Sequence, residues 1–421
     1  MKSVVRITGI AVGGRGVGRI DGKVVFVPYT APGDEALIEI TSEKKGFSEG
    51  RLLKLLEVSH LRVNPACKYF GKCGGCSIQH ISYPAQVEWK DRIFRETIER
   101  IGKTGPLLCD RPVPSPKEFG YRARARFHAD GPMLGFYGAG SRRVVDIEEC
   151  PALEPALNAA LSGIRGAFRA SGTDASALKD FEIAAGNDGK AAASFNFRRI
   201  PPKRLTRALG DEAGLKGFEL NGALKGSVGD VALNYAASGI KFEFRTGVFC
   251  QANLRQNESL INKVLDYCAL AGQARVIDLF SGAGNITLPL AREAREITGV
   301  ESNGEAVRLA IKNASFNAVT SARFVKEDAA VWLGRNIKAL EKERPLVVIL
   351  DPPRSGAPEA ARLLSALKPQ KIIYISCDPP TLARDISVLT ASGYMLLRTA
   401  ILDMFPQTFH IESVSVLELK K

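Results

Sequence analysis

The fold of this chain is decided by the stretch Val276-Ile277-Asp278-Leu279-Phe280-Ser281-Gly282-Ala283-Gly284-Asn285, a short apolar run that leads into glycines. The pattern predicts a strand, a tight turn and the start of a helix, the usual cradle for a nucleotide-like cofactor. The turn lacks the third glycine of the dinucleotide fingerprint and contains no Gly-Lys-Ser/Thr. Neither a dinucleotide nor a nucleoside triphosphate is therefore the best fit.

Strands and helices alternate at close spacing from about Gly247 onward. Near-continuous apolar strands separated by helical segments are typical of a doubly wound parallel sheet. The last two strands follow each other without a helix, so we expect them to form an antiparallel pair at the sheet edge. The sequence thus predicts a C-terminal α/β, Rossmann-like domain over residues 246–421. The expected strands are 275–280, 296–300, 323–326, 346–350, 371–376, 395–402 and 414–419.

Chemically capable residues stand where these strands end. Glu301 can accept hydrogen bonds from both hydroxyls of a ribose, and Asp328 is placed to face an adenine edge, although both also suit solvated loops. Cys377 follows a strand and precedes a helix start, where amide dipoles favour a thiolate; a buried structural cysteine is the competing interpretation. Before the final strand, either His410 or Glu412 can move a proton.

Composition limits the function classes. The chain has 421 residues, enough for two or three domains, and a formal charge of +13. This charge favours a polyanionic partner such as nucleic acid, against the alternative of a merely basic protein. No secretory signal and no apolar run of about 20 residues is evident, so we expect a cytoplasmic protein without membrane contact. A monomer is the default expectation.

The first 58 residues predict a small antiparallel β-barrel. Short alternating strands are separated by turn signals, and Asp21-Gly22 is a strong hairpin turn because both positions tolerate positive φ. Small five-stranded barrels often bind single-stranded nucleic acid, so we predict RNA binding over a purely structural role. The candidate contacts are Arg15, Arg19, Lys44, Lys45 and Arg51.

Four cysteines mark the central region, residues 59–245, which we expect to be α+β. Cys67, Cys73 and Cys76 are closely spaced, and Cys150 follows at a distance. Four thiolates can close a metal site, and the glycines between them allow tight turns around an iron–sulfur cluster. A four-cysteine zinc site is nearly as compatible with the spacing. A helix is expected at 83–100, with packing on the C-terminal domain as one option.

In its motifs the chain resembles the S-adenosylmethionine-dependent RNA uracil-5-methyltransferases that carry a TRAM barrel and a 4Fe-4S cluster, such as the 23S rRNA enzymes. The resemblance covers nearly the whole chain. It rests on the barrel, the cysteine pattern, Phe249-Cys250-Gln251-Ala252-Asn253, Asp-Pro-Pro-Arg at 351–354, Ser376-Cys377-Asp378-Pro379, and Phe-Pro-x-Thr-x-His-x-Glu at 405–412.

The resemblance implies roles for individual residues. Cys377 is the nucleophile and Glu412 the base. The four cysteines hold the cluster, and the cofactor and reactive pocket is lined by Gln251, Phe280, Asn285, Glu301, Asp328 and Asp351. This chain has Asp378 where the family usually has asparagine, which puts the local hydrogen bonding in doubt. Ser281 stands where a cysteine is often found.

Other functions compete with this interpretation. The resemblance implies methylation of C5 of a uridine in RNA, with 23S rRNA favoured and tRNA as the alternative. An exocyclic amino-group methyltransferase usually has an aromatic residue where Arg354 stands and has no use for Cys377. A radical enzyme uses three cluster cysteines rather than four. A non-catalytic, cluster-bearing RNA-binding protein would have no use for a cofactor pocket.

Overall fold

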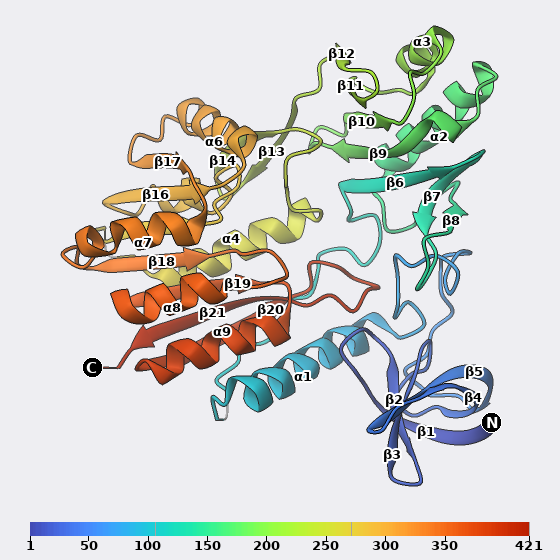
Figure 1. Cartoon of the computed structure of the whole chain (residues 1–421), viewed down its shortest axis with the longest axis horizontal. Helices are drawn as coiled ribbons and strands as arrows, with labels where there is room; N and C mark the ends of the chain where they lie inside the picture. The colour runs from blue at the N-terminus through green and yellow to red at the C-terminus, as the bar shows by residue number, and fades with distance from the viewer. Residues whose placement is uncertain (106, 271, 421) are drawn as a thin grey trace.

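The computed structural model describes residues 1–105, 107–270 and 272–420. Ala271 and Lys421, both within the predicted 246–421 domain, lie outside the described residues. Figure 1 shows three main bodies: a barrel, a central sheet covered by helices, and a C-terminal sheet with helices on both faces. Within the described ranges, no helix combines the length and hydropathy needed to cross a membrane.

The N-terminal barrel is closed, with strand order β1-β2-β3-β5-β4. Its inner face is apolar and includes Val5, Ile7, Val25 and Ile38. All neighbouring pairs are antiparallel except β3 and β5, which run parallel. The predicted barrel is therefore confirmed with one correction: five strands cannot alternate in direction all the way around a ring. Its strands are Lys2–Ile10, Gly16–Ile20, Lys23–Val27, Glu35–Glu43 and Phe47–Glu57.

A buried ion pair attaches the barrel to the chain that follows it. Asp34 is fully buried and accepts hydrogen bonds from the Arg62 guanidinium at 2.8–3.1 Å. The same carboxylate accepts the backbone N–H groups of Ala31 and Ser59, at 2.6 and 3.0 Å. Its charge is thus matched by several donors, as a buried carboxylate requires.

The central sheet has the order β12-β11-β10-β9-β6-β7-β8. Its strands are Arg124–Asp130, Met133–Tyr137, Val144–Asp146, Leu178–Ala185, Ala191–Phe197, Gly217–Gly222 and Gly226–Gly229, numbered β6 to β12. Helices α2 (Pro155–Ala170) and α3 (Lys203–Glu212) pack against each other and share a core with the sheet, and a short 3-10 helix spans Ala175–Ala177. Stacked phenylalanines, Phe127 on Phe181 and Phe181 on Phe195, fill that core.

The C-terminal sheet has the order β17-β16-β15-β18-β19-β21-β20, and β15 to β19 run parallel. The predicted antiparallel pair is present, with β20 at the edge and β21 between β19 and β20. The strands are Arg275–Leu279, Glu296–Glu301, Ala322–Lys326, Leu346–Leu350, Lys371–Ser376, Tyr394–Leu402 and Glu412–Leu419. The helices are α4 Leu254–Cys268, α5 Thr287–Leu290, α6 Gly304–Phe316, α7 Ala329–Leu340, α8 Pro358–Leu367 and α9 Pro379–Ala391.

Two earlier elements pack on this C-terminal sheet. The hairpin β13 (Leu233–Ala237) and β14 (Ile240–Phe244) places Tyr235 and Phe242 in the same apolar cluster as Val276 of β15. Helix α1 (Tyr83–Gly102) lies along α9, and its N-terminal end is beside the barrel (Figure 1). The C-terminal α/β core is therefore completed by segments that come before and after the central sheet in the sequence.

Candidate active site

The glycine-rich turn after β15 leaves open space at the carboxyl edge of the sheet. Phe280 adopts φ +67°, and the N–H groups of Phe280 and Ser281 donate to the Val300 carbonyl at 2.9 and 3.1 Å. Gly282 has φ +55°, and a Cβ at that position would meet no heavy atom within 4 Å. The left-handed backbone folds the turn back over β16 and leaves room for a ligand beside it.

Polar atoms around the turn suit an adenosine-bearing ligand. One Glu301 oxygen accepts the Gly282 N–H at 3.1 Å and the other accepts the Asn303 N–H at 2.7 Å, which fixes the carboxylate beside the turn. Asp278 Oδ1 and Ser281 Oγ are buried and have no hydrogen-bond partner among the described residues. Buried polar atoms normally have partners, so these two fit a site that a polar ligand completes.

The other predicted pocket residues occupy different surroundings. Asn285 accepts hydrogen bonds from Tyr235 and Asn257 at 2.9 and 2.8 Å and donates one back to Asn257, which ties the turn to α4. Asp328 is exposed and caps α7 by accepting the N–H groups of Ala330 and Val331. Gln251 is buried in the segment that precedes α4. Asn285 and Asp328 therefore hold the elements that frame the turn.

Cys377 and Glu412 lie close together at the ends of neighbouring strands. Ser376 of β19 pairs with Ser413 of antiparallel β21, so Cys377, which follows Ser376, and Glu412, which precedes Ser413, both adjoin that pair. Burial raises the pKa of Cys377 to about 11; nearby Glu412 adds to the rise and the Arg354 guanidinium opposes it. Burial, reinforced by Asp351, raises the pKa of Glu412 well above its usual value.

Arg354 and His410 close the small cavity that Cys377 lines. The cavity is about 50 Å³ and is also lined by Val12 of the barrel and by Phe409. Burial, and then the charge of Arg354, lowers the pKa of His410 to about 4, so the ring is neutral at pH 7. Arg354 Nη2 donates to His410 Nε2 at 3.3 Å. The lone pair of His410 Nε2 is therefore engaged by Arg354. Of the two candidates from the sequence, Glu412 is the better placed proton acceptor.

Some site residues were not assigned from the sequence. Asp278 and Ser281 stand within the motif, and a charged residue inside an otherwise apolar strand was the available signal for Asp278. Burial raises the pKa of Asp278 to about 7, and Thr287 donates to its other oxygen at 2.5 Å. The contact of Arg354 with His410 joins segments 56 residues apart, which no local pattern reveals.

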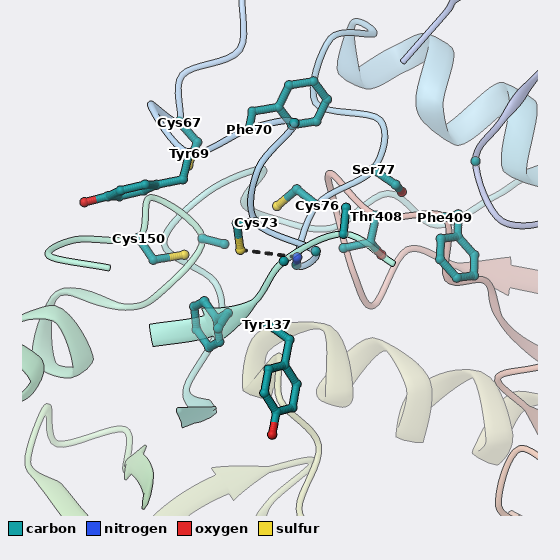
Figure 2. Close-up of a pocket in the computed structure, with 18 of the residues that line it drawn as sticks. Cys67, Tyr69, Phe70, Cys73, Cys76, Ser77, Tyr137, Cys150, Thr408 and Phe409 are labelled. Carbon is teal, nitrogen blue, oxygen red and sulfur yellow. Dashed lines mark hydrogen bonds between the residues drawn. The ribbon is translucent and has the colours of Figure 1, made fainter. Parts of the chain in front are cut away.

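The four cysteines line one larger cavity of about 880 Å³. Figure 2 shows Cys67, Cys73, Cys76 and Cys150 gathered around it, with Tyr69, Tyr137 and Phe409 nearby. The Gly75 N–H donates to Cys73 Sγ at 3.4 Å. Burial, and then the neighbouring thiols, raises the pKa of Cys76 to about 12. Among the described residues, no three metal-binding side chains stand in coordinating geometry.

Comparison with known proteins decides the family. Residues 225–420 match the tRNA (uracil-5-)-methyltransferase family and residues 4–53 match the TRAM domain. A 23S rRNA (uracil(1939)-C(5))-methyltransferase, RlmD, of Methylococcus capsulatus is 34% identical, with 96% of this chain and 94% of the relative covered. The chain belongs to the RNA uracil-5-methyltransferase family. The predicted enzyme class, S-adenosylmethionine-dependent RNA (uracil-5-)-methyltransferase, is thereby confirmed.

Two further comparisons agree with this assignment. RlmD of Neisseria lactamica is 34% identical over 99% of this chain and 96% of its own length. The crystal structure of Pyrococcus abyssi tRNA (uracil-54, C5)-methyltransferase with S-adenosyl-L-homocysteine superposes with TM-score 0.77 at 26% identity. It covers 99% of this chain and all of the archaeal one. The enzyme therefore shares its whole architecture with a solved relative.

Proposed function

We propose that the enzyme methylates C5 of a uridine in 23S rRNA, with a tRNA uridine as the second candidate. The proximity of Cys377 and Glu412, which adjoin the last pair of the β19–β21 ladder, carries the proposal, because C5 methylation needs a nucleophile and a base around one ring. Relatives named as 23S rRNA enzymes over nearly full length favour rRNA, whereas the solved relative is named for tRNA. The charge of +13 suits either polyanion.

Cys377 is proposed as the nucleophile. C5 of uracil is too weak a nucleophile to accept a methyl group unaided. Addition of the Cys377 thiolate to C6 moves the C5–C6 electron pair onto the C4 oxygen as an enolate, which makes C5 nucleophilic. S-adenosylmethionine, when bound, supplies the methyl group on a positively charged sulfur. Glu301, Asp278 and Ser281 would hold the adenosine and amino acid ends of that substrate beside the turn.

Glu412 is proposed as the base that completes the reaction. After methyl transfer C5 carries both the methyl group and its original hydrogen. Removal of that proton by the Glu412 carboxylate restores the C5–C6 double bond and expels Cys377 as a thiolate, so the enzyme is regenerated with one proton gained by Glu412. Asp351 lies close enough to both groups to raise their pKa values and is proposed to orient them.

The four cysteines are proposed to hold a 4Fe-4S cluster. Four thiols lining one cavity supply the required donor set, and the Gly75 N–H directed at Cys73 Sγ is the kind of contact that tunes cluster sulfur. A zinc ion is the alternative. We expect the anaerobically purified enzyme to be brown, with broad charge-transfer absorption in the visible range; a colourless, zinc-loaded sample would contradict the cluster.

The predicted division into residues 1–58, 59–245 and 246–421 is kept as a proposal for the functional units. The first would bind RNA, the second would carry the cluster, and the third would carry out methyl transfer. The packing of α1 and of the β13–β14 hairpin on the C-terminal sheet supports a catalytic unit that uses elements from the central region.

Two variants and a trapping substrate test the mechanism. Cys377→Ala should abolish methylation and any covalent complex with 5-fluorouridine RNA, because fluorine cannot leave C5 as a cation and the adduct persists only if sulfur has bonded to C6. Glu412→Gln should accumulate the methylated adduct on ordinary RNA, because proton removal stalls. An inactive, adduct-free Glu412→Gln enzyme would refute the base. Mapping 5-methyluridine in total RNA from a deletion strain distinguishes rRNA from tRNA.

A further inference from the structure

The segment between β20 and β21, residues 403–411, is here called the catalytic loop because Glu412 follows it directly. The loop contacts residues 67–78, here called the cysteine segment because they include Cys67, Cys73 and Cys76, through the Gln407 carbonyl. This oxygen accepts the N–H groups of Ser77 and Ile78 at 3.1 and 3.2 Å. Ser77 is the chain neighbour of Cys76, so a proposed cluster ligand is directly followed by a residue that is hydrogen-bonded to the loop.

Gln86 of α1 and Gln407 of the loop form a reciprocal pair. Gln86 Nε2 donates to Gln407 Oε1 at 2.9 Å, and the Gln407 N–H donates to Gln86 Oε1 at 2.9 Å. The same Gln86 amide donates to the Ile81 and Ile78 carbonyls at 2.8 and 3.2 Å. Both glutamines are at most 2% exposed, so removal of either partner leaves a buried polar group unsatisfied.

The backbone of Gln407 is itself held in a conformation that a non-glycine residue rarely adopts. Its φ is +69°, in the left-handed region that costs a non-glycine residue energy. Such a backbone persists only where its surroundings fix it, and here the fixing groups are Gln86, Ser77 and Ile78. Two residues further along, Phe409 lines both the cysteine cavity and the small cavity of Cys377.

We propose that Gln86 and Gln407 are positioning residues that fix Glu412 beside Cys377 and connect the segment that carries Cys67, Cys73 and Cys76 to the proton-removal step. The inference rests on the proposed roles of Cys377 and Glu412. Cys377 follows β19 and precedes α9, so the nucleophile is held by elements other than the loop. Loosening the loop should therefore slow proton removal more than thiolate addition or methyl transfer.

The Gln86→Leu variant tests this asymmetry. It keeps the side-chain bulk and removes all of the hydrogen bonds that Gln86 makes to the loop and to the cysteine segment. We expect kcat to fall by about tenfold or more, the methylated covalent adduct to accumulate during turnover, and KM for RNA to change little. Thr97→Val is the matched control: Thr97 is buried on the same helix, and its hydroxyl donates to the Ile93 carbonyl within that helix.

Comparison with Glu412→Gln separates the possible failures. If Glu412→Gln traps no adduct, the proposed role of Glu412 is wrong, and the positioning inference that rests on it falls with it. If Glu412→Gln traps the adduct while Gln86→Leu slows adduct formation and turnover in equal proportion, the mechanism stands and the positioning inference is overturned.

Hydrogen exchange keeps the inference testable even if Gln86→Leu does not fold. Amide exchange is followed in the purified wild-type protein before and after treatment with ferricyanide and EDTA to remove the proposed cluster. We expect faster exchange in residues 403–411 and unchanged exchange in β19. The connection to the cysteine segment would be overturned by either of two results: exchange in residues 403–411 stays unchanged, or exchange in β19 rises as much as exchange in the loop.

Discussion

At the scale of single residues, reactivity depends on the charges around Cys377. Burial disfavours the thiolate, the carboxylates of Glu412 and Asp351 disfavour it further, and Arg354 is the nearby cation that favours it. The pKa of about 11 means that a small fraction of the thiol is ionised at pH 8 in the free enzyme. Electrostatic changes at this site should therefore alter its reactivity in directions that can be stated in advance.

Alkylation of Cys377 provides the measurement. The rate should rise about tenfold per pH unit until the pH approaches the thiol pKa, because only the thiolate reacts. Arg354→Met should slow alkylation at pH 8, because it removes the cation that lowers the pKa of Cys377, whereas Glu412→Gln should speed it at pH values where Glu412 is ionised, because that charge raises the same pKa. Mass spectrometry with iodoacetamide gives both rates. Cys109, whose pKa burial also raises to about 11, is the internal reference. Shifts in the same direction would contradict this account.

From strand positions alone the sequence indicates the proposed reactive residues individually, and only the family resemblance brings Cys377 and Glu412 into one reaction. Cys377 was predicted from its place at a strand end, and His410 and Glu412 from their place before the last strand. Their meeting depends on β21 entering between β19 and β20, an order that local alternation of apolar residues does not encode. Asn285 shows the same limit, because its hydrogen bonds to Tyr235 and Asn257 depend on tertiary packing.

At the scale of elements, helix α1 is joined to the catalytic loop by a buried charge pair. Lys90 Nζ donates to Asp403 Oδ1 at 2.7 Å and to the Phe405 carbonyl at 3.0 Å. The two side chains are 2% and 0% exposed. The helical periodicity of residues 83–100 was visible in the sequence, whereas a buried lysine on its inner face was not, because its partner lies 313 residues away.

Breaking this pair should destabilise the whole enzyme. Lys90→Met leaves Asp403 buried without its cation, which typically costs about 3–5 kcal/mol in the free energy of unfolding. The double variant Lys90→Met with Asp403→Asn should recover much of that loss, because no uncompensated charge remains. Denaturant unfolding measures all three proteins.

The exposed pair Arg92 and Glu96 on the same helix provides the control. Its side chains are 60% and 65% exposed, so Arg92→Gln should change stability by less than about 1 kcal/mol. A loss as large as that of Lys90→Met would mean that any change to α1 destabilises the protein, and that burial of the charge is not the cause.

At the scale of the whole molecule, the barrel presents one end to the cavity that Cys377 lines. Its β1–β2 turn packs against the cysteine segment and the loop: Gly14 lies against Ser77, Ile78 and Phe409, and Val12 lines the cavity of Cys377. Lys2 of β1 pairs with Glu39 and Arg6 with Glu35, so the β4–β5 turn with Lys44 and Lys45 lies at the opposite end of the barrel. Arg15 alone among the five predicted contacts lines the cysteine cavity.

This polarity predicts which barrel cations contact the RNA. Removing one cation that binds a phosphate should reduce the slope of log binding constant against log salt by about 0.7 for a single strand. Arg15→Gln should show such a reduction, because Arg15 stands over Phe26 at 4.7 Å and lines the cysteine cavity. Lys44→Gln with Lys45→Gln should leave the slope unchanged, although it removes more charge. Fluorescence anisotropy of labelled RNA at several salt concentrations gives the slopes. A larger change for the lysine pair would mean that the RNA follows the outer end of the barrel, and that the β1–β2 turn only closes the active site.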